Sequence, residues 1–212
     1  MKVLVIYYSL TGQAVLASDL AAQTLRDAGA EVTMCRVDFA DPAARPRRPF
    51  SLADVKRWSD LAAAGTIFPI ALEPADALEH RYDLIVLFSN TWQHHPSTPI
   101  RSLLALPAMQ RVLQGTPFAI YVVSRLLWEK NASIVKQEAE AAGGICIDTH
   151  HFGHHGGKIS SLFTTVAYML SSGTRVMWPL PKYGLSDEAL ARVQPATKRV
   201  IDKARDWHRR AR

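Results

Sequence analysis

Five short runs of apolar residues recur along the chain, with stretches of helical spacing between them. The runs are rich in Val and Ile, and their apolar character is almost continuous. This pattern is typical of parallel strands that are covered on both faces by helices. The sequence therefore predicts a three-layer α/β domain with a doubly wound, five-stranded parallel sheet. The predicted strands cover residues 2–8, 31–37, 84–89, 118–123 and 144–149.

The segments between these runs carry helix signals. An amphipathic stretch ends at Gly29, and a second one begins at Trp128 and stops at Gly143. A C-terminal basic helix is predicted over 186–210. It begins at Ser186, and we expect Pro195 to kink it or split it.

Two regions are longer than a minimal alternation of strands and helices requires. Residues 40–82 form a long connection with one predicted helix, from Ser51 to about Ala64. Residues 150–185 form an insertion that begins with histidines and glycines and continues into an amphipathic stretch. Because single domains commonly reach 212 residues, we expect one domain over 1–212.

Composition fits a globular protein, with 48% hydrophobic and 21% charged residues. The longest apolar region of the C-terminal part, residues 162–170, is far shorter than the roughly 20 residues of a membrane-spanning helix. No secretory signal is expected at the N-terminus, and the two cysteines lie in apolar runs, so we expect a cytoplasmic protein.

Positive charge is concentrated at the C-terminal end. The net charge is +6, and residues 198–212 contain seven basic and two acidic residues. Such a helix can attract an anionic membrane surface or an acidic partner, or it can be a solvated face with no partner. We do not expect nucleic-acid binding.

A hydroxyl-rich turn follows the first predicted strand. The Ser9 and Thr11 hydroxyls can donate to phosphate oxygens, Gly12 allows a close backbone approach, and the next helix supplies free amides. In a doubly wound sheet, ligands bind at these carboxyl ends of the strands. The alternative is an ordinary helix cap.

This turn resembles the first loop of the flavodoxin-like superfamily, which has the form Ser/Thr-x-Thr-Gly-x-Thr and wraps the phosphate of FMN. Alanine stands here in place of the last threonine, so one phosphate donor is missing. The resemblance implies FMN as cofactor and a phosphate loop made of Ser9, Leu10, Thr11, Gly12, Gln13 and Ala14.

The loop after the third predicted strand resembles the family's aromatic loop, in which a ring stacks on the flavin. The resemblance implies that Trp92 is this ring and that its neighbours also contact FMN. The resulting set is Asn90, Thr91, Trp92 and Gln93.

The loop after the fourth predicted strand is small or glycine-rich in the family, but here it is bulky and basic. Its candidate cofactor contacts are Ser124, Arg125 and Trp128. Arg125 could stabilise a reduced anionic flavin or bind substrate. Alternatively, the loop could fill the pocket and leave it free of flavin.

Six of the eight histidines lie in two groups near strand ends, His94 with His95 and then residues 150–155. They could contact substrate or transfer protons, and the candidate catalytic residues are His94, His95, Arg125 and His151. They could also be surface or packing residues. No recognisable ligand spacing is present, so no metal site is predicted.

The layout of residues 156–181 resembles the extra segment of long-chain, flavin-dependent protoporphyrinogen oxidases of the flavodoxin superfamily, which work beside membranes. One apolar face there could contact a membrane peripherally, pack on the domain, or form a homodimer. Its residues are Leu162, Phe163, Val166, Ala167 and Leu170.

Taken with the resemblance, these features predict an FMN-dependent oxidoreductase. Electrons would pass from a reduced nicotinamide, NAD(P)H, or a protein donor to a small hydrophobic or aromatic, quinone-like acceptor. One alternative is a flavodoxin-type electron shuttle. The other is a flavodoxin-like scaffold that has lost FMN and serves as a binding protein or a non-redox enzyme.

Overall fold

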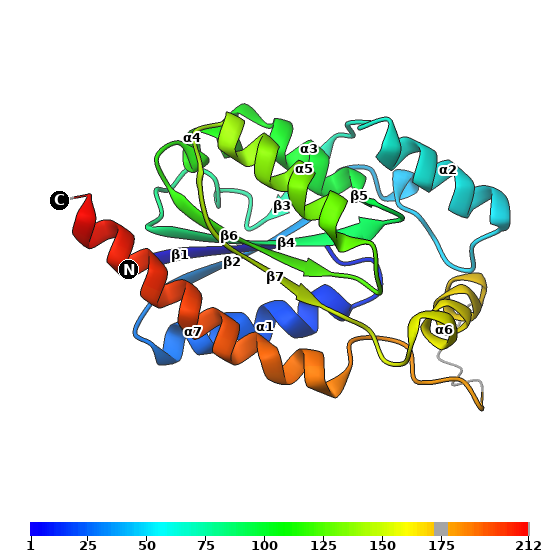
Figure 1. Ribbon diagram of the computed structural model, residues 1–212. Helices are drawn as coiled ribbons and strands as arrows, with labels where there is room; N and C mark the ends of the chain where they lie inside the picture. The colour runs from blue at the N-terminus through cyan, green and yellow to red at the C-terminus, as the bar shows by residue number, and fades with distance from the viewer. Residues whose placement is uncertain (172–177, 212) are drawn as a thin grey trace.

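The computed structural model describes residues 1–171 and 178–211. It has three layers, with a central twisted sheet between two layers of helices (Figure 1). The strands are β1 (Lys2–Tyr7), β2 (Glu31–Phe39), β3 (Ile70–Glu73), β4 (Leu84–Trp92), β5 (His95–Pro96), β6 (Pro117–Val123) and β7 (Ile145–Phe152). The helices are α1 (Gln13–Asp27), α2 (Leu52–Ala63), α3 (Thr98–Ala105), α4 (Pro107–Leu113), α5 (Trp128–Ala141), α6 (Lys158–Leu170) and α7 (Asp187–Arg210), with a short 3-10 turn over Pro42–Ala44.

Five strands run parallel in the order β2-β1-β4-β6-β7. This is the predicted doubly wound arrangement. The direction of the connections reverses between β1 and β4, so a crevice opens at the carboxyl ends of these strands.

The prediction of five strands was wrong in number, because the sheet has seven. β3 lies within the 40–82 connection and pairs antiparallel with the end of β2, with Ile70 opposite Phe39. This pairing extends β2 beyond its predicted end at Val37. β5 folds back on β4 as a two-residue antiparallel pair and places His95 opposite Trp92.

Both faces of the sheet are buried, because successive side chains of the apolar runs point into two different cores. Leu4 and Ile6 point to the side of α3 and α5, and Val3 and Val5 point to the side of α1 and α7. All four side chains have no exposed area. The continuous apolar runs of the sequence are the consequence of this two-sided burial.

Prolines affect the helices in two different ways. Leu106 is extended before Pro107, as steric conflict with a proline ring requires, and it separates α3 from α4. Pro195, by contrast, lies inside an α7 that continues from Asp187 to Arg210, so the expected split does not occur.

The two long segments gather at the carboxyl end of the sheet. Figure 1 shows α2, from the 40–82 connection, and α6, from the 150–185 insertion, at this end of the molecule. Hydrogen bonds join these segments. The Phe50 amide donates to the Met169 carbonyl at 2.8 Å, and Arg48 Nη1 donates to the Tyr168 carbonyl at 3.4 Å. Residues 172–177 of the predicted insertion and the basic Arg212 lie outside the described residues.

Candidate functional site

The loop between β1 and α1 ends at a helix N-terminus that no side chain caps. Gly12 precedes the helix in a left-handed conformation, with φ of 80°. The Ser9 hydroxyl is buried and has no hydrogen-bond partner within residues 1–171 and 178–211. Uncapped amides, the positive end of the helix dipole and an unpartnered hydroxyl together suit an anion.

Residues 183–185 of the insertion lie against this loop. The Tyr183 hydroxyl donates to Thr11 Oγ1 at 3.2 Å, and the Leu185 amide donates to Gln13 Oε1 at 2.8 Å. Gly184 lies between them with φ of 114°, and a Cβ there would stand 2.5 Å from Gln13 Oε1. Two side chains of the loop therefore already have partners within the chain.

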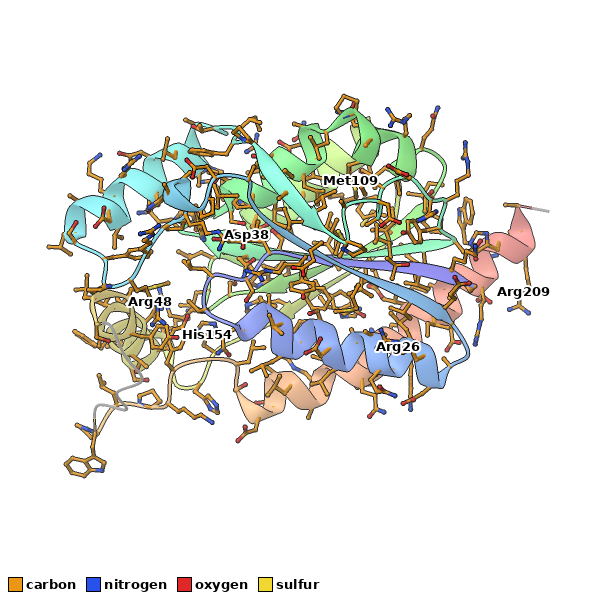
Figure 2. All side chains as sticks on the ribbon, turned by 180° about the vertical axis from the view of Figure 1, so that it is seen from behind. Arg26, Asp38, Arg48, Met109, His154 and Arg209 are labelled. Atoms are coloured by element: carbon orange, nitrogen blue, oxygen red, sulfur yellow. The ribbon has the colours of Figure 1, made fainter. Side chains whose placement is uncertain are left out.

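Tyr183 is held by a stack of side chains. Its ring is parallel to that of Tyr168, with centroids 3.6 Å apart, and the Arg48 guanidinium lies 3.9 Å from the Tyr168 ring centroid on a cation–π contact. Figure 2 shows Arg48 beside α6. Burial raises the pKa of Tyr183 to about 12, so its hydroxyl stays protonated at neutral pH and can donate a hydrogen bond.

The end of β4 is fixed by Asn131 of α5, which is fully buried. Its amide nitrogen donates to Thr91 Oγ1 at 2.9 Å, and its carbonyl oxygen accepts from Ser89 Oγ at 2.8 Å. Asn90 Oδ1 is buried and has no partner in the described parts of the chain. The start of the loop after β4 is therefore fixed by Asn131, and Asn90 Oδ1 beside it is free to accept a hydrogen bond.

Trp92 is half-buried at the end of β4. Its ring makes edge contacts with Tyr8, at 6.2 Å between centroids, and with Trp58 of α2, at 5.4 Å. These contacts set the plane of the indole while part of it stays accessible. The predicted stacking residue is thus presented on a rigid support.

The loop after β6 contacts α6. Arg125 Nη1 donates to the Lys158 carbonyl at 3.0 Å, and Leu127 has a φ of 60° at the start of α5. Trp128 stacks on His151, with centroids 5.3 Å apart and an interplanar angle of 8°. His151 Nε2 lies 3.0 Å from the Ser124 carbonyl, so this stack supports the loop.

A cavity of about 290 Å³ lies at the carboxyl ends of β1, β4 and β6, and α6 lies across it. All three predicted loops reach it. The predicted residues that line it are Leu10, Thr11, Gln13, Asn90, Thr91, Trp92, Gln93, Ser124 and Arg125. Ser9, Gly12, Ala14 and Trp128 do not line it, and Ala14, in the first turn of α1, is buried in the core.

Of the four predicted catalytic residues, the structure places one in the cavity wall, Arg125. His94 is exposed in the β4–β5 turn. His95 has a buried Nδ1 that has no partner among the residues described, and burial lowers its pKa. His151 Nε2 lies 3.0 Å from the Ser124 carbonyl, and burial lowers its pKa as well.

The cavity wall also contains residues that were not predicted as site residues, and His154 and Tyr183 are two of them. The histidine group around 150–155 was a signal for this region. The alternation of side chains along β7 gave no basis for choosing His154 over His151, because His154 lies beyond the end of the strand. A β-bridge to Leu185 positions His154 instead. Nothing in the sequence indicated that Tyr183 belongs to the site, since its partner Thr11 is 172 residues away along the chain.

Burial is the main cause that lowers the pKa of His154 to about 4, and the positive charge of Arg125 adds to it. His154 Nδ1 has no hydrogen-bond partner in the described ranges, and its ring meets that of Tyr183 edge-on at 5.2 Å. The imidazole is therefore neutral at physiological pH.

This histidine predicts acid-sensitive folding. Between the ordinary pKa of 6.5 and about 4, the unfolded chain binds a proton that the folded chain does not, so stability falls as pH falls through this window. The full loss is about 3 kcal/mol. Urea unfolding measures the free energy of unfolding at pH 7 and at pH 4.5. The decrease between the two pH values should be smaller for His154→Gln than for the wild type. The control is the same substitution at exposed His94, and an unchanged loss in His154→Gln would contradict the prediction.

The described residues contain no group of three or more His, Cys, Asp or Glu side chains placed to hold a metal ion. Among the helices described, none combines the length and apolar character needed to cross a bilayer. α6 leaves several apolar side chains partly exposed, among them Phe163 at 58% and Val166 at 42%. Contact of this face with a membrane or a second copy stays a prediction.

Several basic side chains of α7 make contacts within the chain, among them Lys203 and Arg205. Lys203 pairs with Asp148 at 2.9 Å, and Arg205 Nη2 donates to the Ala28 carbonyl at 2.9 Å. Part of the C-terminal positive charge is thus used to fix α7 on the body of the protein.

Comparison by sequence finds no matching family model and no matching curated protein. Comparison by structure finds many similar chains. A flavodoxin from the domain Archaea matches with a TM-score of 0.53 and 11% identity, over 97% of this chain and 99% of that one. A chain from Bacteroides eggerthii described as a candidate flavoprotein matches with a TM-score of 0.52 and 14% identity, over 78% of this chain and 98% of that one. Together with the strand order and the ligand crevice, these likenesses show that the chain has the flavodoxin-like fold.

Proposed function

We propose that this protein binds FMN in the cavity between its three loops and uses it for electron transfer. One observation carries the proposal: a single cavity joins an uncapped helix N-terminus, suited to a phosphate, to a half-buried indole, suited to an aromatic ring. In the cavity wall, the unpartnered Asn90 Oδ1 is the kind of polar atom that a bound ligand satisfies.

Within this proposal, the loop of residues 9–14 would hold the phosphate. The Tyr183 hydroxyl, which donates to Thr11 Oγ1 in the structure, would turn its proton to the phosphate and so supply the donor that Ala14 lacks. Trp92 would stack on the flavin ring, and the guanidinium of Arg125 would favour the negative charge of a reduced ring. When bound, FMN supplies one- and two-electron redox chemistry.

The wider proposal is an oxidoreductase that takes electrons from NAD(P)H or a protein donor and gives them to a small organic acceptor. Two extra segments, α2 and α6, border the cavity through Val55 and through Leu162, Thr165 and Met169. An enclosed site of this kind suits a small substrate better than direct transfer to a large redox partner.

A flavin-free binding protein is the second candidate, and the same loop favours it. Thr11 and Gln13 already have hydrogen-bond partners in residues 183–185, and the cavity of about 290 Å³ is at the lower limit for ligand pockets. In this second case, Tyr183 would occupy the place of the phosphate.

The visible absorbance spectrum of the purified protein, before and after incubation with excess FMN and gel filtration, tests the proposal. We expect flavin bands to elute with the protein. A protein that stays colourless after incubation, yet is stabilised against heat by an apolar ligand, would favour the flavin-free candidate instead.

A further inference from the structure

A second cavity, of about 240 Å³, adjoins the first one. It shares part of its wall with the first cavity, including Trp92, Leu10, Thr91, Gln93 and Met169. The rest of its wall comes from residues that do not line the first cavity, so this space needs its own explanation.

The second cavity is built by the two segments that exceed the basic alternation of strands and helices. Phe50, Leu52 and Trp58 come from the 40–82 connection, and Val166 and Leu170 come from α6. The hydrogen bond from the Phe50 amide to the Met169 carbonyl joins the two sides, and a capping box of Ser51 and Asp54 fixes the start of α2. The space is thus enclosed by fixed elements.

The wall of this cavity is mainly apolar and carries no charged side chain among the described residues. At its edge, Leu52 is 76% exposed and Val55, Val166 and Leu170 are 38–42% exposed, so the approach is apolar as well. The first cavity differs because Arg125 lies in its wall. A charged ligand would lose its hydration in the second cavity without gaining a partner.

We infer that the second cavity binds an uncharged, mainly apolar molecule with one or two rings. Its volume is below that of typical drug-sized pockets, which limits the size of the ligand. Trp58 and Trp92 offer aromatic surfaces to such a ring. Binding of this ligand does not require FMN, but its role as a redox substrate rests on the proposed function.

Equilibrium dialysis with 2-naphthol, which is neutral at pH 7, and with naphthalene-2-sulfonate tests this inference. We expect 2-naphthol to bind at least tenfold more tightly, since the two probes share a ring system and differ in charge. Val166→Asp should weaken 2-naphthol binding at least tenfold and leave the FMN affinity unchanged, because Val166 lines only the second cavity.

Ile159→Asp is the matched control, because Ile159 is on the same helix, is 73% exposed and lines neither cavity. Thermal unfolding of both variants verifies that they are folded. A second variant, Ser59→Leu, narrows the cavity from the side of α2 without adding a charge, and it should also weaken 2-naphthol binding.

Equal binding of the two probes, or equal effects of Val166→Asp and Ile159→Asp, would overturn the inference. FMN binding without 2-naphthol binding would overturn it and spare the proposed function. The reverse result would support the inference and overturn the proposed function.

Discussion

Replacing Trp92 with alanine is expected to weaken FMN binding about 5- to 150-fold. Loss of an aromatic ring that stacks on a ligand ring costs about 1–3 kcal/mol, which corresponds to that change in Kd. The affinity for riboflavin, which has the ring but no phosphate, should fall by a similar factor. Quenching of flavin fluorescence on titration with protein measures both constants.

Two controls separate stacking from damage to the fold. Trp92 also contacts Tyr8 and Trp58, so Trp92→Ala will lower the stability of the fold. The titration is therefore carried out well below the unfolding temperature of the variant. Trp92→Phe keeps a ring and should recover part of the affinity. Trp207→Ala removes an indole from α7, outside both cavities, and should have no effect on binding. An unchanged Kd in Trp92→Ala would exclude Trp92 as the stacking residue.

The position of Trp92 illustrates how far the sequence could predict this protein. Apolar runs such as 84–89 defined the parallel strands, and strand ends defined the edge where a ligand binds. That edge does contain the cavity. The sequence could not show the orientation of the indole, which depends on Trp58 from a distant helix.

The features that the sequence did not predict have a common physical cause. β3 was missed because a four-residue edge strand is made by pairing with β2, and its own pattern in the 40–82 connection is short. The stack of His151 on Trp128, outside the cavity wall, had no signal in the sequence either. Side-chain direction near a strand end is set by contacts between distant segments, and local periodicity does not contain that information.

Replacing Tyr183 with phenylalanine is expected to weaken FMN binding at least about tenfold and to leave riboflavin binding unchanged. A hydrogen bond to a charged group is worth about 1.5–3 kcal/mol, and only FMN carries the phosphate that would receive it. The ring of Tyr183 stays in place in this variant, since it is stacked on Tyr168 at 3.6 Å. The same fluorescence titration measures both affinities.

Tyr168→Phe is the matched control, because it removes a hydroxyl from the neighbouring ring of the same stack and keeps the packing of Tyr183. Tyr168 is not in the wall of the first cavity, so this variant should bind FMN as wild type does. Tighter FMN binding in Tyr183→Phe would contradict the donor role. It would mean that the hydroxyl competes with the phosphate for Thr11, which is what the flavin-free candidate requires. Since Trp92→Ala should affect FMN and riboflavin alike and Tyr183→Phe only FMN, the two variants together assign one end of the cavity to the ring and the other to the phosphate.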